Sequence, residues 1–155
     1  MSNQTSYVTQ QKKTVGDLAV DGLLTGMAAS LAMGVALLLL QFLDGVGPAE
    51  LLGRFDPAND GSTVAGGLMF LAVAGLYGVV YAVVYRLLPS SSMIWKRFSW
   101  LIGAIYGLGL WLAAQYIFLP GFNSALEAIP SSHFAVAHLV YGVTLGYLWG
   151  RSLSS

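Results

Sequence analysis

The chain has 155 residues, carries seven Lys and Arg against seven Asp and Glu, and contains no cysteine. Charged residues make up 9% of it, where an average soluble domain has roughly 25%, and hydrophobic residues make up 56%. This composition excludes an ordinary soluble domain, a nucleic-acid binder, disulfides and thiolate metal sites, and it predicts an integral membrane protein.

Four long apolar stretches follow a polar tail at residues 1–16. They cover about 22–43, 64–88, 98–119 and 131–150, and each is long enough to cross roughly 30 Å of hydrocarbon as a helix. Only helices satisfy the backbone of such segments in lipid, and the runs lack the alternation of barrel strands. We therefore predict an all-α membrane protein with four transmembrane helices in two hairpins. This domain covers residues 17–151, and a short tail at 152–155 follows it.

Two of the three connections contain a further helical signal. Residues 48–54 begin with proline, which favours the first position of a helix, and they predict one or two helical turns. Residues 123–129 predict a second short helix between Pro120-Gly121 and Pro130. Both lie in the loops after the first and third spans. We expect them to be interfacial helices on the outer side of the membrane.

The positive residues indicate the orientation. Six of the seven Lys and Arg would share one side of the membrane if both termini lie there, and only Arg54 would lie opposite. Because positive residues favour the cytoplasmic side, we expect a multi-pass protein of a bacterial inner membrane with both termini in the cytoplasm.

Small residues recur at four-residue steps in every span, and such stripes let helix backbones approach closely in lipid. They either close the four-helix bundle or present one stripe to another protein. Tyr77-Gly-Val-Val and Tyr141-Gly-Val-Thr are also similar, which raises the hypothesis of a duplicated hairpin. The predicted helix-packing residues are Gly26, Ser30, Gly34, Gly78, Gly103, Gly107, Gly142 and Gly146.

Polar residues within the spans are the main candidates for a site, because burying them in lipid is costly. His138 lies inside the fourth span, and Gln115 and Gln41 lie at comparable depths in the third and first. These three side chains could converge on a small polar pocket near the outer surface. Two interpretations stay open: His138 fixes helix packing through a hydrogen bond, or it contacts a ligand such as a quinone headgroup or relays a proton.

Other chemistry has little support in the sequence. His133 and His138 are about 140° apart on a helix, so they cannot hold one metal ion or haem from a single face. A stripe of tyrosines on the second span (Tyr77, Tyr81, Tyr85) usually indicates packing, with a ligand wall as the alternative. No catalytic motif, metal site or cofactor motif is recognisable, and we expect no enzymatic activity.

The stretch from Ala137 to Gly146 resembles the last helix of small bacterial four-helix membrane proteins that form a family of unknown function. The resemblance implies that His138 and Tyr141-Gly142 are signature positions, and it implies no activity. We therefore add Tyr141 to the candidate ligand-binding residues. The expected function is an accessory or structural subunit that packs against partner helices or a second copy in the bilayer. The alternative is a small homo-oligomeric transporter or channel, or a binder of a lipid-like ligand with a polar pocket in the outer leaflet.

Overall fold

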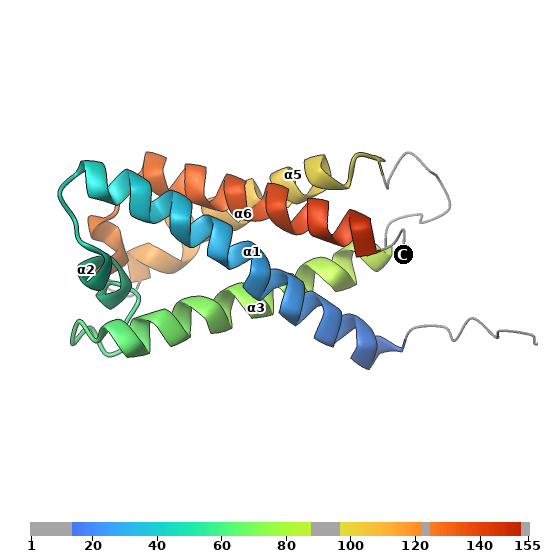
Figure 1. Ribbon diagram of the computed structural model, residues 1–155, viewed down its shortest axis with the longest axis horizontal. Coiled ribbons are helices and arrows are strands. Elements are labelled where there is room, and N and C mark those ends of the chain that lie inside the picture. Colours follow the sequence, from blue (N-terminus) through green and yellow to red (C-terminus); the bar gives the residue numbers. More distant parts are fainter. Residues whose placement is uncertain (1–13, 88–96, 122–124, 153–155) are drawn as a thin grey trace, which may run out of the picture.

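The computed structural model describes residues 14–87, 97–121 and 125–152, and all of its regular secondary structure is helical. Four long helices run along one axis, with the short helix α2 at one end (Figure 1). The polar tails at 1–13 and 153–155 lie outside the described residues. The long helices are α1 (Val15–Leu43), α3 (Thr63–Leu87), α5 (Ser99–Ala113) and α6 (Ser131–Ser152), and the short ones are α2 (Pro48–Gly53), the π-helix η1 (Ala114–Phe118) and the 3-10 turns η2 (Leu119–Gly121) and η3 (Ala125–Ala128).

Three helical segments of the described chain are long and apolar enough to cross a membrane: Val15–Leu43, Thr63–Leu87 and Ser99–Phe118. They expose large apolar side chains such as Leu39 and Ile105, at 64% each, which a soluble protein would bury. The fourth predicted span forms the 22-residue helix α6, which is not among these three. It holds two histidines and several small or polar residues, and it is extensively enclosed by the other helices.

The helix boundaries differ from the predicted spans mainly at the start of α1. This helix begins at Val15, seven residues before the predicted span, because Thr14 and Asp17 form a capping box. The Thr14 N–H donates to Asp17 Oδ2 at 2.8 Å, and the Asp17 N–H donates to Thr14 Oγ1 at 3.2 Å. Acidic residues at the first turn also suit the helix dipole. The first short loop helix is confirmed as α2.

The second predicted loop helix forms only in part. Its described residues contain the 3-10 turn η3, Ala125–Ala128, instead of an α-helix, and residues 123 and 124 lie outside the described residues. Four residues close too few α-helical hydrogen bonds to offset the entropy of ordering them, so the tighter turn is favoured.

Close glycine contacts join the helices in pairs. In the pair α1–α3, a Cβ added to Gly78 would meet Gly22 O and would lie 2.7 Å from Gly26 Cα. At such separations only glycine fits on both helices, as expected for helix pairs in lipid. Ser30 belongs to the same buried stripe, and its hydroxyl donates to Met27 O at 2.7 Å.

The pair α5–α6 repeats this arrangement. A Cβ on Gly142 would meet Gly103 O and would lie 2.9 Å from Gly107 Cα. Gly146 adds a further contact, since a Cβ there would lie 3.0 Å from Gly103 Cα. Both hairpins thus have close glycine contacts, with three glycines in α1–α3 and four in α5–α6. Six of the predicted packing glycines thus lie against backbone atoms of the partner helix, whereas Gly34 of α1 meets the Phe70 ring of α3, 3.6 Å from its potential Cβ.

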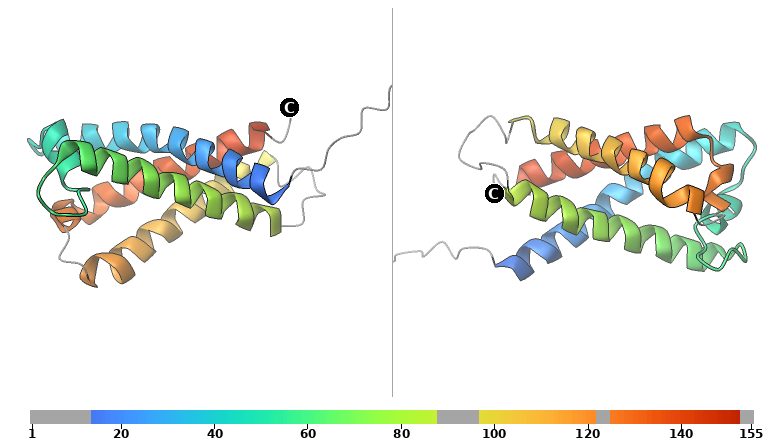
Figure 2. Two further views of the ribbon diagram at one scale, coloured as in Figure 1. Left: turned by 90° about the horizontal axis from the view of Figure 1, so that it is seen from below. Right: turned by 180° about the vertical axis from the view of Figure 1, so that it is seen from behind.

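The two hairpins join through α6, which packs against both α1 and α5. The chain from α5 into η1 runs obliquely and moves away from α3 toward the α2 end (Figure 2). Both ends of the described chain lie at the opposite end of the bundle (Figure 1). The fold therefore leaves its loosest region between α3, η1 and α6, beside α2.

Candidate functional site

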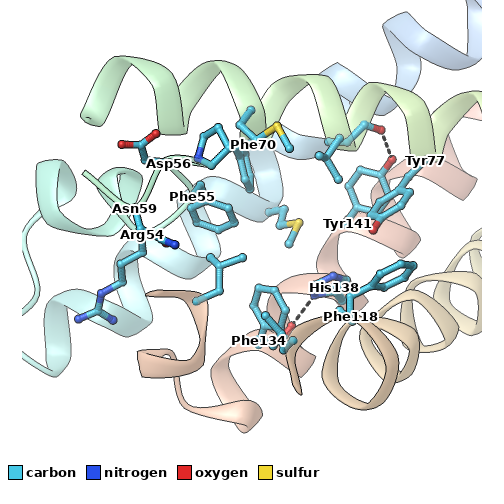
Figure 3. A pocket seen from close by; sticks show the side chains of 18 residues that line it. Arg54, Phe55, Asp56, Asn59, Phe70, Tyr77, Phe118, Phe134, His138 and Tyr141 are labelled. Carbon is cyan, nitrogen blue, oxygen red and sulfur yellow. Dashed lines mark hydrogen bonds between the residues drawn. The ribbon is translucent and has the colours of Figure 1, made fainter. Parts of the chain in front are cut away.

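A cavity of about 470 Å³ occupies this loose region. It lies within the range of roughly 300–1,000 Å³ that holds small-molecule ligands. Aromatic side chains from the α2–α3 loop, α3, η1 and α6 surround its open centre (Figure 3). The lining residues are Met33, Arg54, Phe55, Asp56, Pro57, Asn59, Met69, Phe70, Val73, Ala74, Tyr77, Ala114, Phe118, Leu119, Leu126, Phe134, His138 and Tyr141.

The π-helix η1 forms one wall of the cavity. Residues 114–118 were predicted as the regular end of the third span, but here the helix widens. A π-helical turn takes up an extra residue and so rotates the residues after it, and such turns are frequent at functional sites. Ala114 and Phe118 line the cavity, whereas Tyr116 and Ile117 point outward and are 71% and 69% exposed.

His138 lines the same cavity from α6 and is 4% exposed. Its Nδ1 lies 2.8 Å from the carbonyl oxygen of Phe134, and its ring packs edge-on against the Phe134 ring at 4.4 Å. A carbonyl can only accept, so Nδ1 carries the proton and donates it. No acidic side chain is recorded as a partner of this imidazole in the described residues, and burying an unpaired charge is costly, so the ring is neutral. Nε2 is then a lone-pair acceptor.

This acceptor has no hydrogen-bond partner among the described residues. It is also not sealed inside the protein. The fully enclosed side-chain polar atoms without a partner, among the residues described, are the Nε1 atoms of Trp111 and Trp149. His138 therefore presents an open acceptor to the cavity.

The tyrosines divide into packed and open hydroxyls. Tyr141 donates to Ala74 O at 2.6 Å, and Tyr106 donates to Tyr77 O at 2.7 Å, so both hydroxyls hold helices together. Tyr81 similarly donates to Ser99 O at 3.3 Å. Tyr77 lines the cavity, and its hydroxyl makes no hydrogen bond within the described segments. One tyrosine of the predicted stripe thus forms part of a cavity wall.

Gln41 does not converge with His138 as the hypothesis of one polar pocket required. It is 1% exposed, and its Oε1 accepts from Arg54 Nη1 at 3.0 Å. Its Nε2 lies 3.4 Å from Nδ1 of His133, which in turn lies 3.2 Å from Asp44. Arg54 pairs with Glu50 at 2.8 Å, and Figure 3 shows its guanidinium directed away from the cavity centre.

Gln115 is half-buried in η1 and is not among the residues that line the cavity. The structure thus brings His138 and Tyr141 together in the cavity, holds Gln41 in a separate polar cluster, and leaves Gln115 outside both. The aromatic walls from Phe55, Phe70 and Phe118 were not predicted as part of a site.

Asp56 organises the loop that covers one end of the cavity. Its carboxylate accepts hydrogen bonds from the backbone N–H groups of Ser62 at 2.9 Å, Ala58 at 3.1 Å and Asp60 at 3.2 Å. These hydrogen bonds, that of Ser62 foremost, hold the pKa of Asp56 below its ordinary value. The charged form therefore stabilises the loop.

Replacing Asp56 with asparagine should lower the melting temperature of the purified protein at pH 7. The amide keeps one acceptor oxygen, so at least one N–H group loses its partner. The stabilisation by the carboxylate is fully present above the ordinary pKa and is lost as pH falls through the lowered one. The difference between the two proteins should therefore shrink below about pH 4. Thermal unfolding from pH 7 to pH 3 measures this, with the exposed Asp60→Asn as control; an unchanging difference would contradict it.

Within the described residues, no three His, Asp or Glu side chains come together in a way that could hold a metal ion. In the same part of the chain, His133 lies beside a single carboxylate, that of Asp44. The described segments instead offer a mostly apolar cavity into which His138 presents one open acceptor.

The fold and the cavity define a class: a helical membrane protein with a ligand-sized cavity among its helices. A family model of unknown function, DUF6789, matches residues 17–154. The chain belongs to this family, and the expected membership in a family of unknown function is confirmed. Searches of curated proteins and of solved structures find no match.

Proposed function

We propose that this protein binds one lipid-like molecule in the cavity between α3, η1 and α6, without enzymatic activity. The single observation that supports this most is the cavity itself, because about 470 Å³ of open space is far more than the close packing of protein interiors usually leaves. Its walls are mainly apolar, as in most small-molecule sites. This corresponds to the alternative function expected from the sequence.

The cavity opens toward the side of the bundle. Met69 of α3 and Phe118 of η1 both line it, and they are 41% and 51% exposed at the surface. A mouth between two apolar helices would face hydrocarbon in a bilayer. A lipid-like molecule could then enter from the membrane without crossing water.

The proposal includes four spans, with α6 as the fourth, in a bacterial inner membrane. Because both ends of the described chain lie opposite α2, and because Arg86, Arg97 and Arg151 lie at that end of their helices, we infer that this end is cytoplasmic. A reporter that is active only outside the cytoplasm should be silent after Ser152 and active in the loop at Asp60. The reverse pattern would contradict the orientation.

Native mass spectrometry of protein released from bacterial membranes tests the binding. We expect one amphiphile of defined mass to remain on each chain at collision energies that strip annular lipids. A mass spectrum that shows the chain without a bound molecule, or only with a series of different lipids, would contradict the proposal. The exposed variant Ile117→Trp serves as a control, because it changes the lipid-facing surface and leaves the cavity wall unaltered.

A second candidate is the accessory or structural subunit, which would pack against other membrane proteins or a second copy. One observation favours it: α5 packs mainly against α6 and leaves Leu101, Ile105 and Leu112 exposed. The glycine stripes no longer support it, since they are used within the chain. Size exclusion with mass spectrometry in mild detergent tests it, and a clean monomer without partners would count against it.

A further inference from the structure

We infer that the cavity selects amphiphiles whose head is a ring bearing a hydroxyl group, the chemistry of phenols and quinols, and that Nε2 of His138 accepts the hydroxyl hydrogen. This inference rests on the proposed function and names its ligand class. It starts from the fixed tautomer, because the bond from Nδ1 to Phe134 O leaves Nε2 able only to accept.

An open acceptor in an apolar cavity distinguishes between ligand heads. A hydroxyl gives it a hydrogen bond, whereas an ether or ketone oxygen presents only lone pairs and leaves it unsatisfied. Tyr77, whose hydroxyl is open, can donate to either kind of oxygen, so it adds affinity without selecting the donor. The selection therefore comes from His138.

The aromatic walls favour a ring in the head. Six aromatic side chains line the cavity: Phe55, Phe70, Tyr77, Phe118, Phe134 and Tyr141. Phe55 and Phe70 already pack edge-to-face with centroids 5.0 Å apart, and an aromatic ligand ring extends such contacts. A ring head with an apolar tail that leaves through the mouth between Met69 and Phe118 fits this arrangement.

Two probes that differ in one methyl group test the inference. We expect 4-nonylphenol to bind the purified protein in nanodiscs about tenfold more tightly than 4-nonylanisole, in isothermal titration. 1-Decanol, which has a hydroxyl but no ring, should bind more weakly than 4-nonylphenol. Equal affinities for phenol and anisole would overturn the role of His138, and decanol binding as tightly as the phenol would overturn the ring. Failure of all three to bind would instead contradict the proposed function.

Two variants test whether Nε2 of His138 causes the preference for the phenol over the anisole. His138→Phe keeps a ring at this position and removes the acceptor, so the preference for phenol over anisole should fall to about onefold. Tyr106→Phe is the matched control, because it loses a partly buried hydrogen bond, its side chain does not line the cavity, and it should keep the preference. A preference that persists in His138→Phe would overturn the inference. If that variant fails to fold, the affinities of the two probes for the unmodified chain still test the inference, because equal affinities would overturn it.

Discussion

Replacing Gly142 with alanine should destabilise the protein by about 1–3 kcal/mol, the usual cost of overpacking a well-packed contact. The added methyl group would meet the backbone oxygen of Gly103 and would lie 2.9 Å from Gly107 Cα. Because both obstacles are backbone atoms, no side-chain rotation can relieve the clash. Helices α5 and α6 must move apart along their whole contact.

The same change should weaken ligand binding, because the α5–α6 contact also holds the cavity. A Cβ on Gly107 would meet His138 O, so α5 supports the turn of α6 that carries His138. Thermal unfolding in detergent measures the stability, and titration with an amphiphile measures binding. Gly109→Ala is the matched control, since nothing lies within 4 Å of its potential Cβ. A melting temperature for Gly142→Ala equal to that of this control would contradict the packing argument.

Hydropathy predicted the positions of the long helices because lipid-facing surface must be apolar over a fixed length. The end of α1 at Leu43, the start of α3 at Thr63 and the start of α6 at Ser131 lie within a residue of the predicted spans. The start of α1 was not predicted, because Asp17 and Asp21 interrupt the apolar run in its first two turns. The capping residues Thr14 and Asp17 carry that information locally, and they could have been used to place it.

The glycine stripes show what sequence periodicity can predict about helix packing and what it cannot. Four-residue spacing predicts a smooth helix face, and a Cβ added at Gly26, Gly78 or Gly142 would meet backbone atoms of the neighbouring helix. Spacing alone cannot say whether the smooth face meets a helix of the same chain or of another protein. The contacts answer this for the α1–α3 and α5–α6 pairs, where each stripe faces its own hairpin partner.

The candidate site could be predicted only in part. Polarity within an apolar span indicated His138, and this residue does line the cavity. Similar depth in the membrane also predicts that His138 lies near Gln41 and Gln115, but depth does not determine which helix faces meet. Gln41 is instead occupied by Arg54 of the loop, a contact between distant segments that no spacing rule contains. The cavity itself depends on the π-helix η1, and no residue pattern in 114–118 distinguishes it from an α-helix.

Replacing Ala114 with tryptophan should strongly weaken ligand binding while the protein stays folded. Ala114 lies in η1 and lines the cavity, so a large side chain there can fill the open space in place of a ligand. Filling a cavity with apolar atoms often adds about 0.5–2 kcal/mol of stability. We therefore expect a melting temperature at or above that of the unmodified chain, with the affinity for 4-nonylphenol reduced at least tenfold, on the order of 1.4 kcal/mol.

Thermal unfolding with and without ligand measures the loss of binding, because a bound ligand raises the melting temperature. An amphiphile at 100 times its Kd stabilises a protein that binds it by about 2.7 kcal/mol, so the unmodified chain should melt several degrees higher with ligand than without. Ala114→Trp should lose at least half of this shift, because a Kd ten times larger leaves about 1.4 kcal/mol of stabilisation at the same ligand concentration. Ile117→Trp, three residues away on the exposed face of η1, adds the same indole outside the cavity and should keep the full shift. If both variants keep it, the ligand binds elsewhere on the lipid-facing surface, because Ala114 lines the cavity and Ile117 does not.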